Sequence, residues 1–264
     1  MLVTPDFVFI NNPRTGTTYA RQAIKAAYSV PGRVELVQEL ILPIRRGWKS
    51  SGVDHHGTFE QIPPAFSHLA VASAVRNPFT LVVSSYELGI WKSRVPPDQS
   101  VLKRFDKFPD LSLLEYLHFQ ESLMPMRWGI SYEEHGVGAM SAHFIQMFAI
   151  SAALAFDRVR LGDPFGELSK LIANVKFLRQ ESLRAELGAF LTHFVGPDPA
   201  RDAVALRPRH VTRRQHTWSS SALGGDVVAH MMSREAFLFE HLEANGVNYT
   251  FQNADFFREW TPLV

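Results

Sequence analysis

The chain opens with an apolar segment, FVFI at residues 7–10, which runs directly into the small-residue turn NNPRTGTT and then into helix-forming sequence. This order predicts a turn at the carboxyl end of a strand. A turn rich in Gly and Thr lets several backbone N–H groups face one anion, and the following helix adds about half a positive charge at its N-terminus. Arg14 lies inside the turn, where its charge can face the same anion. A plain turn capped by Thr15 or Thr17 is the alternative, and it needs no ligand.

Two further segments have the composition of strands. HLAVASAV at residues 68–75 is a nearly continuous run of small and β-branched residues, as in the buried strands of parallel sheets. It ends at Arg76, and we expect a helix from Pro78 to about Trp91, because proline is well tolerated in the first turn of a helix. NVKFL at residues 174–178 predicts a third strand. Strands that alternate with helices predict an α/β fold: a three-layer arrangement with a parallel sheet flanked by helices and ligands at the carboxyl ends of the strands.

The remaining segments are mostly helical in pattern. Helical periodicity or good helix formers mark residues 17–29, 111–119, 139–156, 179–194 and 226–245. We expect a glycine-punctuated loop at residues 128–138 and a second loop from Arg45 to Pro64. Residues 34–44 fit a strand or a short helix equally well.

Composition limits the classes of protein that remain. The 264 residues are 46% hydrophobic, enough for one substantial core, so we expect a single domain over residues 1–264. The 27 basic and 26 acidic residues nearly cancel, which argues against nucleic acid or an anionic membrane as a partner. The absence of cysteine excludes disulfides and a cysteine nucleophile. Because the sequence contains no signal-peptide pattern and no apolar run near the ~20 residues of a membrane span, we expect a cytoplasmic protein.

A second junction from strand to helix reads AVRNPFTLVVSSYE. If the strand ends before Asn77, Arg76 lies at the carboxyl edge of the sheet and Ser84 lies about two helical turns further along. Both side chains can then reach a second phosphate beside the first turn. One such turn is more often a structural cap or a salt bridge than a binding site, but two such junctions in one short α/β chain are less easily dismissed.

Three motifs together resemble a known family. PRTGTT, then HGT, then VRNPFTLVVSSY, in this order and spacing, resemble the sulfotransferases that use 3′-phosphoadenosine 5′-phosphosulfate, and most of all the branch that contains the carbohydrate O-sulfotransferases. The similarity is strong over about residues 7–30 and 54–90, and weak but collinear in KFLRQESL at residues 176–183. It implies the P-loop NTPase-like fold of that family.

The resemblance also implies roles for individual residues. In the family, the first loop holds the 5′-phosphosulfate, which corresponds here to Arg14, Thr15, Gly16, Thr17 and Thr18. The 3′-phosphate is held by an Arg and a Ser of the last motif, which correspond to Arg76 and Ser84. Many members carry Lys where this chain has Arg14, and because arginine stays protonated its expected role is electrostatic. The family often has another Arg in the last motif, and this chain has Leu81 there.

The HGT motif contains the expected catalytic base. By resemblance, His56 removes the proton of the acceptor hydroxyl, and the adjacent His55 is the alternative base. An unperturbed imidazole has a pKa of ~6.5, so it can accept a proton near neutral pH. The alternative is that both histidines lie in a solvated loop and have no catalytic role.

The family resemblance therefore implies an enzyme. It would transfer a sulfuryl group from 3′-phosphoadenosine 5′-phosphosulfate to a hydroxyl of a carbohydrate or small molecule and release adenosine 3′,5′-bisphosphate. Two alternatives remain: a nucleotide-binding protein without transferase activity, and a nucleoside-triphosphate phosphotransferase. The sequence lacks the GxxxxGK[ST] motif that the phosphotransferase class uses.

The most basic segment is RPRHVTRRQHTW at residues 207–218. It fits a solvated loop, an RNA contact or, by the family resemblance, a loop that closes over the nucleotide with Thr212 and Arg213 as contacts. The chain has 11 histidines but no HExxH pair or comparable ligand spacing, so the sequence predicts no metal site.

Overall fold

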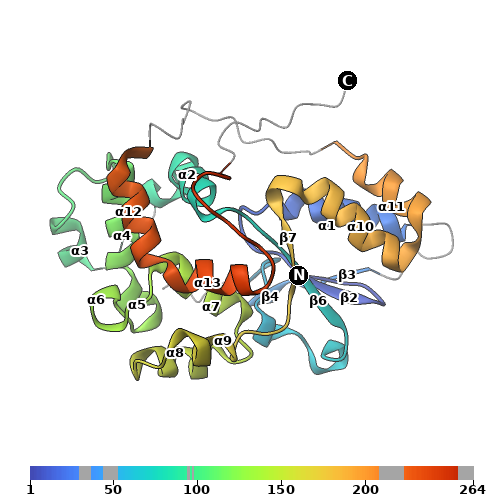
Figure 1. Cartoon of the computed structure of the whole chain (residues 1–264), viewed down its shortest axis with the longest axis horizontal. Helices are drawn as coiled ribbons and strands as arrows, with labels where there is room; N and C mark the ends of the chain where they lie inside the picture. The colour runs from blue at the N-terminus through green and yellow to red at the C-terminus, as the bar shows by residue number, and fades with distance from the viewer. Residues whose placement is uncertain (30–36, 44–52, 94–95, 97, 208–222, 255–264) are drawn as a thin grey trace.

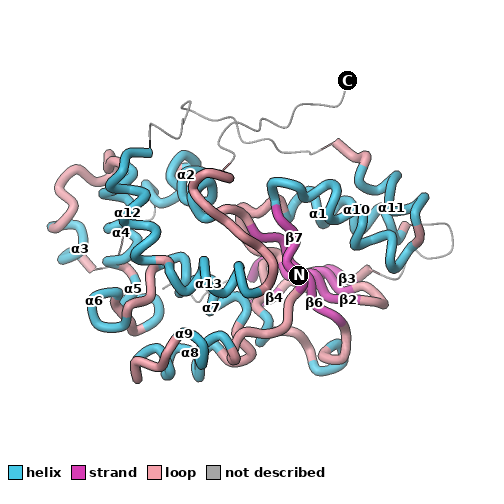
Figure 2. The backbone as a smooth tube through the Cα atoms, viewed as in Figure 1, coloured by secondary structure: helices cyan, strands magenta, loops and turns pink. Residues whose placement is uncertain are grey.

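The computed structural model of the chain describes residues 1–29, 37–43, 53–93, 96, 98–207 and 223–254. Its architecture is α/β, with helices on both faces of a five-stranded sheet (Figures 1 and 2). The strands are β1 (Leu2–Val3), β2 (Phe7–Ile10), β3 (Gln38–Glu39), β4 (Leu42–Pro43), β5 (Val53–Asp54), β6 (Ala70–Val75) and β7 (Lys176–Arg179). The α-helices are α1 (Thr17–Tyr28), α2 (Pro78–Leu88), α3 (Gln99–Lys103), α4 (Leu113–Ser122), α5 (Met124–Trp128), α6 (Tyr132–His135), α7 (Ala139–Phe148), α8 (Ala152–Arg160), α9 (Phe165–Ser169), α10 (Leu183–Val195), α11 (Pro197–Val204), α12 (Gly224–Arg234) and α13 (Ala236–Ala244).

The main sheet is mixed, so the prediction of a parallel sheet is correct only for three of its strands, which run from the middle of the sheet to one edge. Its order is β3-β1-β2-β6-β7, with β2, β6 and β7 parallel and β1 antiparallel to both of its neighbours. The tight turn between β1 and β2 causes this, because a hairpin can join only antiparallel strands. Thr4 closes that turn, since its N–H and its hydroxyl both donate to the carbonyl of Phe7.

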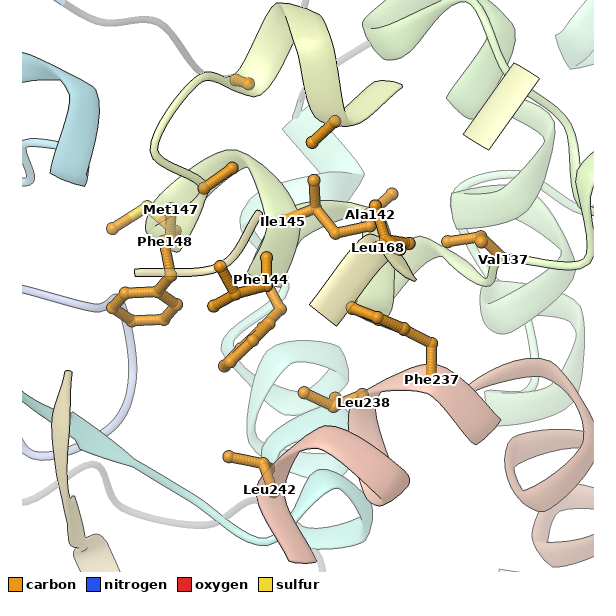
Figure 3. Packing of buried hydrophobic residues seen from close by; sticks show 14 of the residues in the cluster. Val137, Ala142, Phe144, Ile145, Met147, Phe148, Leu168, Phe237, Leu238 and Leu242 are labelled. Atoms are coloured by element: carbon orange, nitrogen blue, oxygen red, sulfur yellow. The ribbon is translucent and has the colours of Figure 1, made fainter. Parts of the chain in front are cut away.

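Alternating side chains of the parallel strands point to opposite faces of the sheet, as the pleat requires. One face packs against α1, α10 and α11 through Phe7, Phe9, Ala72, Ala74 and Leu178. The other face presents Ile10, Val75 and Phe177 to the helices around α7 and α13, and Figure 3 shows the apolar side chains of that layer. The central strands are therefore covered on both sides, which explains their nearly continuous apolar sequence.

A third apolar cluster lies among helices to one side of the sheet, where side chains of α2, α3, α4 and α12 meet (Figure 1). Trp91 is buried in it and contacts the rings of Tyr86, Phe108, Tyr116 and Phe119. Its indole N–H donates to the carbonyl of Tyr86 at 3.0 Å. Trp91 is thus a core residue with its one donor satisfied.

Several predicted boundaries need correction. The helix predicted from Pro78 to about Trp91 ends at Leu88, because Gly89 takes the left-handed conformation (φ 64°), and a short 3₁₀ helix, Ile90–Ser93, follows. The loop predicted at residues 128–138 contains α6, and the helical segment predicted at 139–156 divides into α7 and α8. The segment that fitted a strand or a helix forms β3 and β4, and β4 pairs with β5 inside the loop predicted from Arg45 to Pro64.

The helical segment predicted at 226–245 also divides, at Glu235, into α12 and α13. The buried carboxylate of Glu235 accepts hydrogen bonds from the N–H groups of Met140 and Ser141 at 3.0 and 2.7 Å. These donors belong to the first turn of α7, whose N-cap residue, Gly138, has no side chain to do this. Burial raises the pKa of Glu235 against the opposing effect of these hydrogen bonds.

Among the described residues, no helix combines the length and the apolar character that crossing a bilayer requires.

Candidate functional site

The candidate site lies where β2 and β6 end side by side. The two strands are parallel neighbours, with Ile10 opposite Ser73, so their carboxyl ends lie at the same edge of the sheet. The first loop, residues 11–16, leaves β2 there and leads into α1. The second junction, Arg76 and Asn77, leaves β6 and leads into α2.

The backbone of the first loop is strained. Arg14 has φ 65° and is the one non-glycine residue with positive φ in the described part of the chain. Gly16, two residues later, has φ 81°. The left-handed region costs a residue with a Cβ about 1–2 kcal/mol, and such strain concentrates at functional loops. Left-handed positions in a tight turn direct successive N–H groups toward one side, which is how backbone concavities for anions form.

The loop is held in this shape by its own threonines. The hydroxyls of Thr15 and Thr17 both donate to the carbonyl of Asn12, at 2.9 and 3.2 Å, and both side chains are buried. The amide of Asn12 donates to the carbonyl of Ala74 on β6 at 3.3 Å. These two threonines therefore shape the loop with their hydroxyls and can offer only backbone N–H groups to a ligand, whereas Thr18 is exposed.

The first turn of α1 has no side-chain cap. Its N-cap residue is Gly16, and no described residue accepts a hydrogen bond from the N–H groups of Gly16, Thr17 or Thr18. A Cβ on Gly16 would lie 2.8 Å from Cδ2 of Leu183, so α10 packs directly behind the turn. The result is a helix N-terminus with open donors and a positive dipole end, held against a neighbouring helix.

The second junction starts α2 through conventional caps. The side chain of Asn77 accepts a hydrogen bond from the N–H of Phe79 at 3.0 Å, and Pro78 occupies the first helical position. Arg76 donates through Nε to Oγ1 of Thr80 at 2.9 Å, which directs its guanidinium along the start of α2.

Direct contacts join the two junctions. Nη1 of Arg76 donates to the carbonyl of Arg14 at 3.4 Å, and Nη1 of Arg14 donates to the carbonyl of Ser84 at 3.0 Å. The structure therefore brings Arg14, Arg76 and Ser84 together, as the sequence predicts. Ser84 is half-buried, and its hydroxyl makes no hydrogen bond to any described residue.

Arg14 also lies near the helical part of the molecule. Burial raises the pKa of Tyr116 on α4 to about 12, although the positive charges of Arg14 and Arg127 act in the opposite direction. The guanidinium of Arg14 is thus close enough to α4 to influence a buried phenol there. The candidate site lies at the sheet edge beside α2, which Arg14 contacts at Ser84 and Arg76 contacts at Thr80.

Two residues that the sequence analysis did not identify hold the second junction. Glu181 accepts hydrogen bonds from the N–H of Asn77 at 2.8 Å and from the hydroxyl of Tyr249 at 2.8 Å. Burial and the Glu181 carboxylate raise the pKa of Tyr249, so this phenol stays protonated and remains a donor. Glu181 belongs to the weakly similar KFLRQESL segment, but nothing in the sequence links Tyr249 to it.

His56 is held by the first loop. Its Nδ1 lies 2.7 Å from the carbonyl oxygen of Asn11. A carbonyl can only accept, so Nδ1 carries the hydrogen, and in a neutral imidazole the lone pair then belongs to Nε2. The rest of the HGT motif is structural: a Cβ on Gly57 would lie 2.4 Å from a carbon of Met1, and Thr58 forms a capping box with Gln61.

His55 has a different environment. Its ring packs against that of His56, with centroids 4.2 Å apart, and its carbonyl accepts a hydrogen bond from the Asn11 amide at 2.7 Å. Asn11 is fully buried, and its Oδ1 has no hydrogen-bond partner among the described residues. The sequence analysis missed Asn11, which fixes the tautomer of one histidine and the backbone of the other.

Two residues named in the sequence analysis, Thr212 and Arg213, lie outside the described residues, so their expected role as nucleotide contacts stays a prediction. The same holds for the basic segment around them from Pro208 to Trp218.

Comparison with protein-family models, curated proteins and solved structures finds no match to this chain. The resemblance to sulfotransferases therefore stays a prediction that depends on the motifs and on the geometry described above.

Proposed function

We propose that this protein transfers a sulfuryl group from 3′-phosphoadenosine 5′-phosphosulfate to the hydroxyl of an acceptor. The observation that carries the proposal is the pair of contacts between the two junctions, Arg76 to the carbonyl of Arg14 and Arg14 to the carbonyl of Ser84. They bring two arginines and an uncapped helix N-terminus to one sheet edge. A ligand with two separate phosphate groups matches that arrangement of charge.

The first loop is suited to the 5′-phosphosulfate end of the donor. The open N–H groups of Gly16, Thr17 and Thr18 supply donors that need no reorganisation when charge develops. Arg14 adds a fixed positive charge. Preorganised donors of this kind are each worth ~3 kcal/mol in transition-state stabilisation when they face a developing oxyanion.

The second junction is suited to the 3′-phosphate. The guanidinium of Arg76 is oriented by Thr80 and by the first loop, and its planar fork matches the oxygens of a phosphate. The hydroxyl of Ser84 adds a second donor. A 3′-phosphate distinguishes this donor from ATP, so these two residues would set the preference between the two nucleotides.

His56 is suited to be the base. The acceptor oxygen attacks sulfur, the bond from sulfur to the bridging oxygen of the 5′-phosphate breaks, and the acceptor proton passes to Nε2 of His56. The electron pair of the broken bond stays on the 5′-phosphate, beside Arg14 and the loop N–H groups. The hydrogen bond from Nδ1 to Asn11 fixes the required tautomer and favours the imidazolium that forms.

Nucleotide binding gives the first test. Isothermal titration calorimetry with adenosine 3′,5′-bisphosphate should show binding that Arg76→Ala weakens about 10- to 150-fold, the worth of one hydrogen bond to a charged group. The matched control is Arg201→Ala, which removes an exposed arginine of α11 that pairs with Asp198. Equal affinities for the two variants, or tighter binding of ATP with Mg²⁺ than of the bisphosphate, would contradict the proposal.

Transfer of labelled sulfate gives the second test. With a radiolabelled donor and a panel of hydroxyl-bearing acceptors, His56→Ala should keep bisphosphate affinity and lose about 10²- to 10⁴-fold in rate. His55→Ala is the neighbouring control and should retain most of the rate. Binding without transfer to any acceptor would favour the nucleotide-binding protein without transferase activity.

A further inference from the structure

Three side chains that can bind a metal meet between α4 and α12, which pack side by side in the helical part of the molecule (Figure 1). His118 and Glu121 are three residues apart on α4 and so share one face of that helix. His230 comes from the middle of α12. One ligand atom from each of the three residues lies within 4.8 Å of the other two.

The individual distances approach those of a metal site. Nε2 of His230 is 3.0 Å from Oε1 of Glu121, and Nδ1 of His118 is 3.6 Å from Oε2 of the same carboxylate. Ligands that bind Zn²⁺ tetrahedrally at 2.0–2.2 Å are separated from one another by about 3.3 Å. Small rotations of the imidazoles, whose ring centroids are 4.7 Å apart, would direct the three ligands at one ion.

The setting favours an ion over a solvated cluster. The side chains of Glu121 and His230 are each only 10% exposed, while His118 is 48% exposed and leaves a route for entry. A nearly buried carboxylate needs a compensating positive charge. Arg234 approaches Glu121 only to 4.0 Å, because its guanidinium lies over the ring of Tyr132 at 3.6 Å and faces Glu133 at 3.6 Å.

We propose that His118, Glu121 and His230 bind a divalent transition-metal ion of the zinc type, which would link α4 to α12. Two imidazoles and one carboxylate form a donor set that zinc accepts, and they leave a fourth position for water or another ligand. The proposal departs from the sequence expectation of no metal site, which nothing else in the structure tests. His230 follows Glu121 by more than 100 residues, so no short spacing motif could reveal the set.

Zinc titration of the purified, untagged chain tests the proposal. After removal of metal with a chelator, calorimetry in phosphate-free buffer should show one Zn²⁺ per chain, with a rise in the melting temperature that saturates at the same ratio. His118→Ala changes a half-exposed position and should weaken zinc binding tenfold or more. The matched control, His193→Ala on α10, removes an exposed helical histidine and should bind zinc as the wild type does.

Cobalt gives an independent readout. Co²⁺ bound to this set should give a visible absorption band that His118→Ala and Glu121→Gln both abolish. If the wild type shows no saturable zinc binding, or if His118→Ala binds zinc and cobalt as tightly as His193→Ala, the cluster is an ion pair only and the proposal is wrong. Binding of adenosine 3′,5′-bisphosphate should be unchanged in these variants, so the result does not depend on the proposed sulfuryl transfer.

Discussion

Substitution of Gly16 by alanine is the sharpest test of how the first loop is built. Gly16 has φ 81°, and a Cβ there would lie 2.8 Å from Cδ2 of Leu183 and 3.3 Å from Cγ of Gln180. The shorter distance is one that real Cβ atoms essentially never show. Leu183 is fully buried against α1 and the sheet, so its side chain cannot move aside without disturbing that layer.

Two separate costs add up in the Gly16→Ala variant. A left-handed conformation costs an alanine about 1–2 kcal/mol relative to glycine. Forcing one extra carbon into a packed layer costs about 1–3 kcal/mol. The free energy of unfolding should therefore fall by about 2–5 kcal/mol.

Urea unfolding at 25 °C measures the total loss of stability in Gly16→Ala, and a second glycine separates the conformational cost from the packing cost. Gly162 has φ 73°, but nothing lies within 4 Å of a Cβ built there. Gly162→Ala should therefore lose only the conformational part, about 1–2 kcal/mol. The double variant Gly16→Ala with Leu183→Ala should be less destabilised than the sum of the single variants, because the smaller side chain removes the clash.

Two results would contradict this prediction: a loss of stability in Gly16→Ala no larger than that in Gly162→Ala, or strict additivity in the double variant. Either result would mean that α10 does not press on the loop. The variant also has a functional readout, since a shift of the loop moves the N–H groups of Thr17 and Thr18, and bisphosphate affinity should fall with it.

Two further predictions concern charge. Arg14→Gly removes the backbone strain at φ 65°, but it also removes the hydrogen bond to Ser84 and makes the unfolded chain more flexible, so the free energy of unfolding in urea should change by no more than about 1 kcal/mol. Calorimetry should show the affinity for the bisphosphate falling tenfold or more. If stability and affinity fall together, Arg14 is a structural residue. Burial lowers the pKa of His241 to about 4, so the folded chain excludes a proton that the unfolded chain takes up near pH 6.5. The part of the free energy of unfolding that depends on His241 is therefore constant above about pH 6.5, and it falls by up to ~3 kcal/mol as the pH drops to 4. His241→Gln should flatten the pH dependence of urea unfolding in that window, and an unchanged slope would refute the assignment.

The sequence predicted the centre of the sheet because local signals there agree with the tertiary structure. Strands β2 and β6 are apolar runs that end at polar turns, and helices α1 and α2 begin at Gly16 and at Asn77 with Pro78, which are local start signals. These features decide where the first loop and the second junction lie. Each of these signals is carried by a few adjacent residues, so a local pattern suffices.

The parts that the sequence missed depend on contacts between distant segments. Strands β1 and β3 have two residues each, too few for any periodicity, and only their pairing makes the sheet mixed. The apolar pattern of residues 139–156 continues across the break between α7 and α8. There, Ile150 donates to the carbonyl of Leu171, and Ala149 bridges to Ile172 instead of continuing the helix.

The same distinction applies within the candidate site. The residues expected to touch the ligand are carried by short motifs, whereas Asn11, Glu181 and Tyr249 act on those motifs through contacts up to 174 positions apart in the chain. Asn11 contacts both histidines: its carbonyl accepts a hydrogen bond from Nδ1 of His56, and its side-chain amide donates to the backbone carbonyl of His55. In the proposed function, a base whose orientation is set by the first loop moves with that loop. Occupation of the loop by the proposed donor would therefore act directly on His56, the proposed base. The buried Oδ1 of Asn11, which pairs with no described residue, lies at the residue that joins the two.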